Sequence, residues 1–260
     1  MPVTTRFREL IDRPEILPAM GGYDALSARL IERAGGEVVY MGGSSVSTSV
    51  HGYPDVGLTP MTVMVDRARG MASAVDVPVF CDVDTGYGNP INVMRTVEEY
   101  ERAGVAGIHI EDQTFPKKCG HFEGKDVVPT GEMAGKIRAA TDAREDDDFV
   151  VVVARTDARA VEGFERAVER AEAYLDAGAD ALFVEAPTTR EELERVGEAF
   201  PDAPLVANRP RGARRRCSPR PSSRRWATTS SSTPRRGSRP RRRPWRSSTP
   251  RSPKRGHSAG

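Results

Sequence analysis

The sequence has few cysteines and no apolar stretch long enough to cross a membrane. Its 260 residues include three cysteines, which is too few for a disulfide framework and is typical of a reducing compartment. Residues 1–10 lack the apolar core of a secretion signal, and no apolar run approaches the roughly 20 residues of a membrane-spanning helix. These absences argue against secreted and membrane-bound classes, so we expect a cytoplasmic protein with no membrane partner.

The C-terminal segment lacks acidic residues and almost all large apolar ones. Residues 209–260 contain no Asp or Glu and no Val, Ile, Leu, Met, Phe or Tyr, but 17 Arg, 11 Ser and 8 Pro. Because such a segment cannot bury enough apolar area to offset the cost of ordering its backbone, it is predicted to be a non-globular tail. We interpret it either as a basic arm that binds nucleic acid or, by preference, as a frameshifted translation of GC-rich coding DNA.

The preceding residues carry the opposite charge. The tail takes 18 of the 39 basic residues, so residues 1–208 keep 21 of them against all 37 acidic residues. This excess of negative charge argues against nucleic acid as a partner of residues 1–208, and it leaves nucleic-acid binding through the tail as a remote alternative. Residues 1–208 are long enough to enclose one sizeable hydrophobic core.

A repeated pattern in residues 1–208 predicts a parallel sheet covered by helices. The amphipathic segments 24–33, 93–102 and 164–175 each end near a glycine that precedes a short apolar run. This order is typical of a helix, its glycine C-cap and a buried strand. Further apolar runs bring the total to about seven strand–helix alternations.

Polar residues follow most of the predicted strands. Five of them stand at or just after strand ends: Asp82, Glu111, Arg155, Glu185 and Asn208. They favour a barrel over a doubly wound sheet, which would need a Gly-rich phosphate-binding turn after its first strand. We therefore predict an α/β fold of the (β/α)₈ TIM-barrel type. Residues 1–208 would form its incomplete catalytic domain, without the last strand and the C-terminal helices, and would be poorly stable because of the open seam.

Two carboxylates at the end of one predicted strand indicate a cation site. Asp82 and Asp84 are two residues apart, so their side chains are expected to point the same way. With the glycines that follow and with Glu111 at the end of the next strand, they suit a hard cation such as Mg²⁺, held partly through water. The alternative is a polar loop with an Asp-capped turn.

The loop after Glu111 contains a cysteine in basic surroundings. Cys119 stands between Lys117 and His121, and nearby positive charge favours the thiolate form. The alternative is an ordinary half-buried cysteine, which composition alone would favour. Cys81 lies inside a predicted strand and is expected to be a core residue.

Two further features could bind an anionic substrate. Arg155, at a strand end, could clamp a substrate carboxylate with two hydrogen bonds, or it could form an internal ion pair with Asp157 or Glu185. The backbone N–H groups of Gly42, Gly43 and Ser44 could cradle an anion, although Gly-Gly-Ser is common in loops.

Together these motifs resemble the isocitrate lyase and phosphoenolpyruvate mutase superfamily. They occur in order from residue 16 to residue 208, and the segments 82–89 and 117–121 are specific to that superfamily. The stretch Lys-Lys-Cys-Gly-His looks like its carbon–carbon lyases, and the segment 183–187 and the short loops look most like the 2-methylisocitrate lyase branch. Relatives usually have Ser-Gly where this chain has Gly42-Gly43, so a hydroxyl donor is missing unless Ser44 or Ser45 replaces it.

The resemblance implies a role for each matching residue. Mg²⁺, with Mn²⁺ as the alternative ion, would be held by Asp82 and Asp84, with Glu111 and Asp55 supporting its water shell. Lys117 and His121 would flank the catalytic Cys119. The substrate would be bound by the side chains of Arg155, Glu185 and Asn208 and by the backbone of Gly42, Gly43 and Ser44.

The resemblance also implies an activity. A 2-hydroxy tricarboxylate, 2-methylisocitrate or isocitrate, would be cleaved to succinate and a 2-keto acid. The alternatives are hydrolysis or decarboxylation of oxaloacetate and other reactions of the superfamily. Relatives commonly form homotetramers with exchanged C-terminal helices, and because this chain is expected to lack those helices, its own oligomeric state is not predicted.

Overall fold

A computed structural model describes residues 1–120, 122–145, 150–208 and 225–229, and the structural statements below concern these residues. His121, which the sequence analysis placed beside Cys119, lies outside the described residues.

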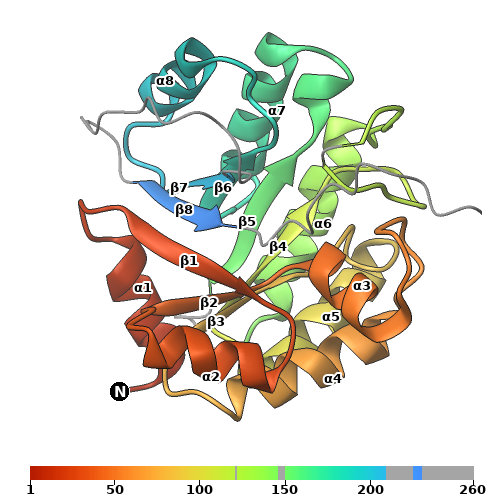
Figure 1. Cartoon of the computed structure of the whole chain (residues 1–260). Coiled ribbons are helices and arrows are strands. Elements are labelled where there is room, and N and C mark those ends of the chain that lie inside the picture. The colour runs from red at the N-terminus through yellow and green to blue at the C-terminus, as the bar shows by residue number, and fades with distance from the viewer. Residues whose placement is uncertain (121, 146–149, 209–224, 230–260) are drawn as a thin grey trace, which may run out of the picture.

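Eight parallel strands in sequential order form a closed barrel (Figure 1). The strands are β1 (Leu17–Gly22), β2 (Val38–Met41), β3 (Val79–Asp82), β4 (Gly107–Glu111), β5 (Val150–Thr156), β6 (Ala181–Val184), β7 (Leu205–Asn208) and β8 (Arg225–Thr229). The TIM-type barrel predicted from the alternation of strands and helices is confirmed.

The last strand differs from the expectation. We expected its position to be empty, but β8 comes from the Arg-rich segment and pairs in parallel with both β7 and β1. The physical reason is that strand pairing uses backbone N–H and C=O groups, which almost every residue carries, and the edges of β7 and β1 would otherwise be unpaired. The rest of residues 209–260 lies outside the described residues, so its interpretation as a frameshifted tail stays a prediction.

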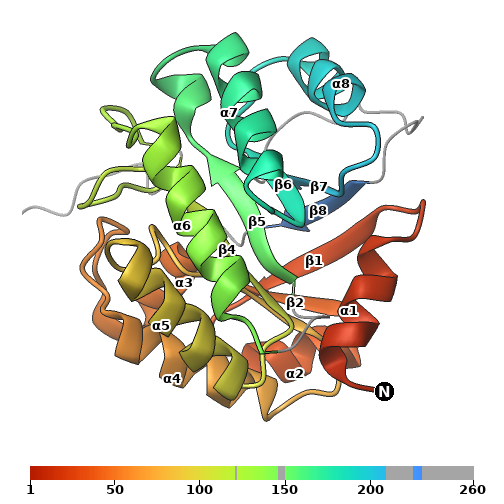
Figure 2. The same ribbon diagram turned by 180° about the vertical axis from the view of Figure 1, so that it is seen from behind.

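Eight α-helices in the described chain follow or precede the strands. They are α1 (Val3–Ile11), α2 (Ala25–Arg33), α3 (Gly43–His51), α4 (Met61–Ala72), α5 (Pro90–Arg102), α6 (Thr130–Ala143), α7 (Phe164–Asp176) and α8 (Arg190–Ala199). Both views show α4, α5 and α6 outside β3, β4 and β5 (Figure 2). The expected lack of C-terminal helices concerns residues that lie mostly outside the described ranges, so it stays a prediction.

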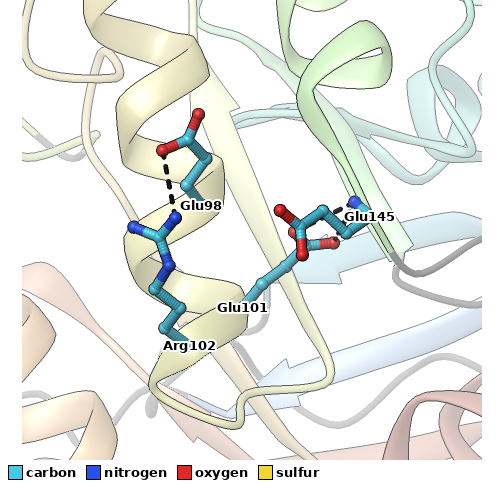
Figure 3. Close-up of a pocket in the computed structure, with 4 residues that line it drawn as sticks. All are labelled: Glu98, Glu101, Arg102 and Glu145. Carbon is cyan, nitrogen blue, oxygen red and sulfur yellow. Dashed lines mark hydrogen bonds and ion pairs between the residues drawn. The ribbon is translucent and has the colours of Figure 1, made fainter.

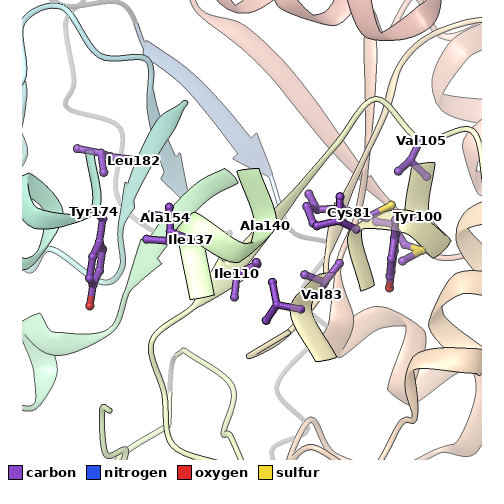
Figure 4. Close-up of a cluster of buried hydrophobic side chains, with 14 of the residues drawn as sticks. Cys81, Val83, Tyr100, Val105, Ile110, Ile137, Ala140, Ala154, Tyr174 and Leu182 are labelled. Atoms are coloured by element: carbon purple, nitrogen blue, oxygen red, sulfur yellow. The ribbon is translucent and has the colours of Figure 1, made fainter. Parts of the chain in front are cut away.

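The barrel strands separate two hydrophobic clusters. Inside the barrel, Phe7 of α1 packs with strand residues such as Val38 and Phe80. Outside, the alternate residues of the same strands pack against the helices, as strand geometry requires. Cys81 belongs to this outer cluster (Figure 4), so its expected place in the core is confirmed.

The described residues contain no helix that is both long and apolar enough to span a membrane.

Candidate active site

The carboxyl ends of neighbouring strands bring charged residues to one rim of the barrel. Asp82 ends β3, Glu111 ends β4, Arg155 lies near the end of β5 and Glu185 follows β6. All four are buried. Since parallel strands end at the same rim, residues that are far apart in the sequence become neighbours, as in other barrels of this type.

Asp82 is held by backbone donors. Its Oδ2 accepts a hydrogen bond from the N–H of Gly43 at 3.1 Å, and its Oδ1 accepts one from the N–H of Asp84 at 3.0 Å. A Cβ on Gly43 would lie 3.0 Å from Asp82 Oδ2 and 3.1 Å from Asp84 Oδ1. The start of α3 can therefore approach both carboxylates this closely because residue 43 has no side chain.

Of the two serines that could replace the missing hydroxyl donor, Ser45 is engaged. Its hydroxyl donates to the Gly42 carbonyl at 2.8 Å, within the first turn of α3. Ser44 is exposed at the same helix start.

Lys117 bridges two carboxylates beside this helix start. Its Nζ lies 2.6 Å from Asp55 Oδ1 and 2.6 Å from Asp84 Oδ1, and its side chain is 2% exposed. Burial, together with the charges of Asp82 and Asp55, raises the pKa of Asp84 to about 6, although Lys117 opposes the shift. The pKa values of Asp82 and Asp84 thus shift in opposite directions. Burial disfavours the charged form of Asp82 too, but His109, Lys117 and Arg155 hold the pKa of Asp82 below its ordinary value.

Arg155 is anchored by acidic groups. Its Nε donates to Asp157 Oδ2 at 2.9 Å and lies 3.3 Å from Glu111 Oε2. The internal ion pair with Asp157, one of the two readings of the sequence, is therefore present. Gly120 packs directly on the Arg155 guanidinium. A Cβ on Gly120 would lie 2.4 Å from Arg155 Nη2 and 2.7 Å from Glu185 Oε1.

The turn that carries Cys119 lies over this rim. The N–H of Cys119 donates to the Asp55 carbonyl at 3.0 Å, and the carbonyl of Cys119 accepts from the N–H of Phe122 at 2.8 Å. Asp55 in turn contacts Lys117. The structure therefore brings Cys119 to the same face of the barrel as Asp84, Arg155 and Glu185.

Asn208, at the end of β7, has a buried Oδ1 without a hydrogen-bond partner in the described chain. An unsatisfied buried acceptor at this rim is open to a ligand hydroxyl or a water molecule.

Two residues that sequence reasoning missed lie below the rim. The Tyr40 hydroxyl and His109 Nε2 are 2.9 Å apart, and His109 Nε2 is 3.7 Å from Asp82 Oδ1. Burial lowers the pKa of His109 to about 4, so the imidazole is neutral at neutral pH. A signal was available, since His109 is two residues before Glu111 and must share its strand face.

Two more residues that sequence reasoning missed bind the loop that carries Cys119 and the carboxylate that orients Arg155. Gln113 Nε2 donates to Glu111 Oε1 at 3.1 Å and to the Lys118 carbonyl at 2.8 Å. Lys125 Nζ donates to Asp157 Oδ1 at 2.7 Å. Asp157 shares the strand face of Arg155, but no sequence pattern indicates Lys125, because its place depends on the path of the loop.

The balance of charge and the donor chemistry fit a divalent cation. In the described part of the site, six carboxylates surround Lys117, Lys125 and Arg155: Asp55, Asp82, Asp84, Glu111, Asp157 and Glu185. No three His, Cys, Asp or Glu side chains of the described residues converge closely enough to coordinate one ion directly. Carboxylate oxygens are nevertheless the donor type that Mg²⁺ prefers.

A cavity of about 550 Å³ adjoins the site. Gly57, Thr85 and Gln113 contribute to its walls, and each of them is close in sequence to a rim residue. A second cavity of about 320 Å³ is lined by Glu98, Glu101, Arg102 and Glu145 (Figure 3). It lies at the ends of α5 and α6 that precede strands, which is the opposite end of the barrel from the charged rim.

The fold and the rim define a (β/α)₈ barrel with an acid-rich mouth crossed by a cysteine-bearing loop. The chain belongs to the phosphoenolpyruvate phosphomutase family, whose model matches residues 7–218. The superfamily resemblance that the motifs indicated is confirmed.

Two relatives are named lyases. The chain is 49% identical over 214 residues to 2,3-dimethylmalate lyase of Eubacterium barkeri, covering 82% of this chain and 73% of that protein. It is 48% identical over 202 residues to probable 2-methylisocitrate lyase 1 of Corynebacterium glutamicum, covering 78% and 66%. The chain thus spans about two thirds to three quarters of the length of these relatives.

Solved structures include hydrolases of the same fold. Oxaloacetate acetylhydrolase in complex with 3,3-difluorooxalacetate has a TM-score of 0.80 and 36% identity, covering 87% of this chain and 80% of that chain. Phosphonopyruvate hydrolase in complex with oxalate and Mg²⁺ has a TM-score of 0.72 and 37% identity, covering 79% and 71%.

Proposed function

We propose that this chain catalyses Mg²⁺-dependent carbon–carbon cleavage of a 2-hydroxy tricarboxylate, 2-methylisocitrate or isocitrate, to succinate and a 2-keto acid. The single observation that carries the proposal is the packing of the Cys119–Gly120 turn on Arg155 and Glu185, at the rim where Asp82 and Asp84 meet. The two named lyases among the relatives support it.

Polar and charged groups of the site would recognise the substrate. Arg155, already oriented by Asp157, offers its guanidinium to a carboxylate. Glu185 and Asn208 would bind the hydroxyl and a second carboxylate, and the N–H groups of the segment 42–44 would bind the keto acid half. Each contact fixes the orientation of the reacting bond, which is the main contribution of binding groups to such a reaction.

A cation is needed because the acidic site must accept an acidic substrate. Asp82 and Asp84 would hold Mg²⁺, with Glu111 acting through its water shell and Mn²⁺ as the alternative ion. When bound, the ion supplies Lewis-acid polarisation of the substrate hydroxyl and the adjacent carboxylate.

Cys119 would complete the reaction. Cleavage releases the hydroxyl proton, forms the C=O of the keto acid and leaves a carbanion next to a carboxylate. This carbon must receive a proton from an acid on the side opposite the keto acid half, and the hydroxyl proton balances the one that this acid loses once solvent reprotonates it. The thiol of Cys119, on the turn above Arg155, is the group of this chain that we assign to that step. Lys117 and His121 would flank it, although His121 lies outside the described residues.

Hydrolysis of oxaloacetate is the second candidate, because the oxaloacetate acetylhydrolase structure shares the fold at 36% identity. It uses the same charged rim but releases oxalate. Decarboxylation would release carbon dioxide instead, so the three products separate the reactions.

The experiment is a substrate panel on the purified full-length chain. We expect keto acid release from 2-methylisocitrate, isocitrate or 2,3-dimethylmalate with Mg²⁺, none with a chelator, and a loss of roughly 100-fold or more in C119S. C81S, in the outer core, is the matched control and should keep most of the activity. Oxalate from oxaloacetate with no keto acid from the 2-hydroxy acids would overturn the lyase proposal in favour of the hydrolase.

A further inference from the structure

Lys125 is a buried cation that the proposed reaction does not use. Its side chain is 2% exposed, and it lies on the loop between β4 and α6, five residues after Gly120. A buried ammonium is costly unless it is paired and hydrogen-bonded, so its contacts indicate what it does.

Lys125 makes two contacts that join different parts of the site. Its Nζ donates to the Gly120 carbonyl at 2.6 Å and to Asp157 Oδ1 at 2.7 Å. One contact therefore lies on the turn that carries Cys119, and the other lies on the carboxylate that orients Arg155.

The Asp157 end of this connection is firmly fixed. The N–H of Asp157 donates to Asp112 Oδ1 at 2.9 Å, and Asp112 Oδ2 accepts from Thr156 Oγ1 at 2.7 Å and from the Tyr174 hydroxyl at 2.8 Å. Asp112 and Asp157 are fully buried. Asp157 is thus tied to β4, β5 and α7, so the Lys125 ammonium has a rigid anchor.

At the other end of the connection, the packing of Gly120 restricts movement of the turn toward the barrel. Gly120 already touches Arg155 and Glu185 so closely that a Cβ would clash with both. This packing prevents the turn from moving toward Arg155 and Glu185. Movement of the turn away from them is opposed by hydrogen bonds to its backbone. The bond from Lys125 to the Gly120 carbonyl is such a restraint, one residue from the thiol.

We propose that Lys125 is a positioning residue that holds the Cys119–Gly120 turn against Arg155, through its simultaneous bonds to the Gly120 carbonyl and to Asp157. Neutralising Asp157 does not by itself require Lys125, since Arg155 contacts both oxygens of that carboxylate, at 2.9 and 3.3 Å. The bond to Gly120 is what Arg155 cannot replace.

The test compares K125M, which has no donors, with K118M as the matched control. Lys118 lies on the same loop and donates to the Gly124 carbonyl, but in an exposed position. The two readouts are the rate of Cys119 alkylation by iodoacetamide, followed by peptide mass spectrometry, and the separate values of kcat and KM.

In K125M we expect Cys119 to be alkylated several times faster than in the native chain. We also expect kcat to fall roughly 10- to 100-fold, because small displacements of a catalytic group are this costly, and KM to stay close to native because Arg155 keeps Asp157 and Glu111. K118M should match the native chain in both readouts. If K125M does not fold, K125Q replaces it, since the shorter glutamine cannot reach both partners and should shift both readouts the same way.

The kcat readout rests on the proposed lyase function, but the alkylation readout does not. Faster alkylation in K125M without any turnover in the native chain would support the positioning inference and count against the proposed function. Native alkylation rates and native kcat in folded K125M or K125Q would overturn the inference.

Discussion

At the scale of single residues, the positive charge of Lys117 offsets the repulsion between buried carboxylates at the rim. Its ammonium lies 2.6 Å from both Asp55 and Asp84, and it is as buried as they are. Removing one partner from such a buried group leaves uncompensated charge, which costs far more than the pair contributes.

We predict that K117M lowers the free energy of unfolding by roughly 3–5 kcal/mol in the absence of divalent cations. Added Mg²⁺ should recover part of this loss in K117M and should stabilise it more than the native chain, because a bound cation offsets the same carboxylates. Urea unfolding with and without Mg²⁺ measures both values, with K118M as control. An equal loss at all Mg²⁺ concentrations would contradict the proposed cation site.

The sequence indicated the rim residues that stand at strand ends and, through the Lys-Lys-Cys-Gly-His motif, the loop residues Lys117 and Cys119, but it did not indicate every residue that a loop places. Asp82, Glu111 and Arg155 could be found because parallel strands must end at one rim. Asp157 was named as a partner of Arg155, and His109, which shares a strand face with Glu111, could have been found by the same spacing. Lys125 could not, because its contacts with Gly120 and Asp157 depend on the course of a long loop.

At the scale of elements, β8 is the unexpected part of the barrel. Ala227 is in register with Pro18 of β1 and with Ala207 of β7. Periodicity predicted the strands that have apolar side chains, and it missed β8 because its pairing depends on the backbone alone.

We predict that A227P destabilises the chain by about 1–3 kcal/mol, because proline removes a ladder donor and leaves an acceptor of a neighbouring strand unpaired. A227S keeps the N–H and should remain close to native. Thermal unfolding and light scattering of the two variants measure this. If A227P melts and scatters like A227S, closure of the barrel by β8 would be refuted, and the seam between β7 and β1 would be open as the sequence first indicated.

At the scale of the whole molecule, a barrel of negative charge is joined to a strongly basic segment. The barrel and the superfamily could be predicted from residues 1–208 because the polar strand ends, the glycine C-caps of the helices and the Cys119 motif all indicate the same fold. The substrate could not, since the same rim would serve lyases and hydrolases of this fold. The proposed reaction therefore requires that the thiol, the guanidinium and the carboxylates share one ligand.

The most direct measurement is the rate of Cys119 alkylation in the native chain with pyruvate, with Mg²⁺, and with both together. We predict that only the combination slows alkylation, because the keto acid and the cation would bind jointly beneath the turn, and that D82N and D84N abolish this protection. If calorimetry shows that pyruvate and Mg²⁺ bind together while Cys119 is alkylated at an unchanged rate, the ligand lies elsewhere, and a shared site for the thiol and the carboxylates is refuted.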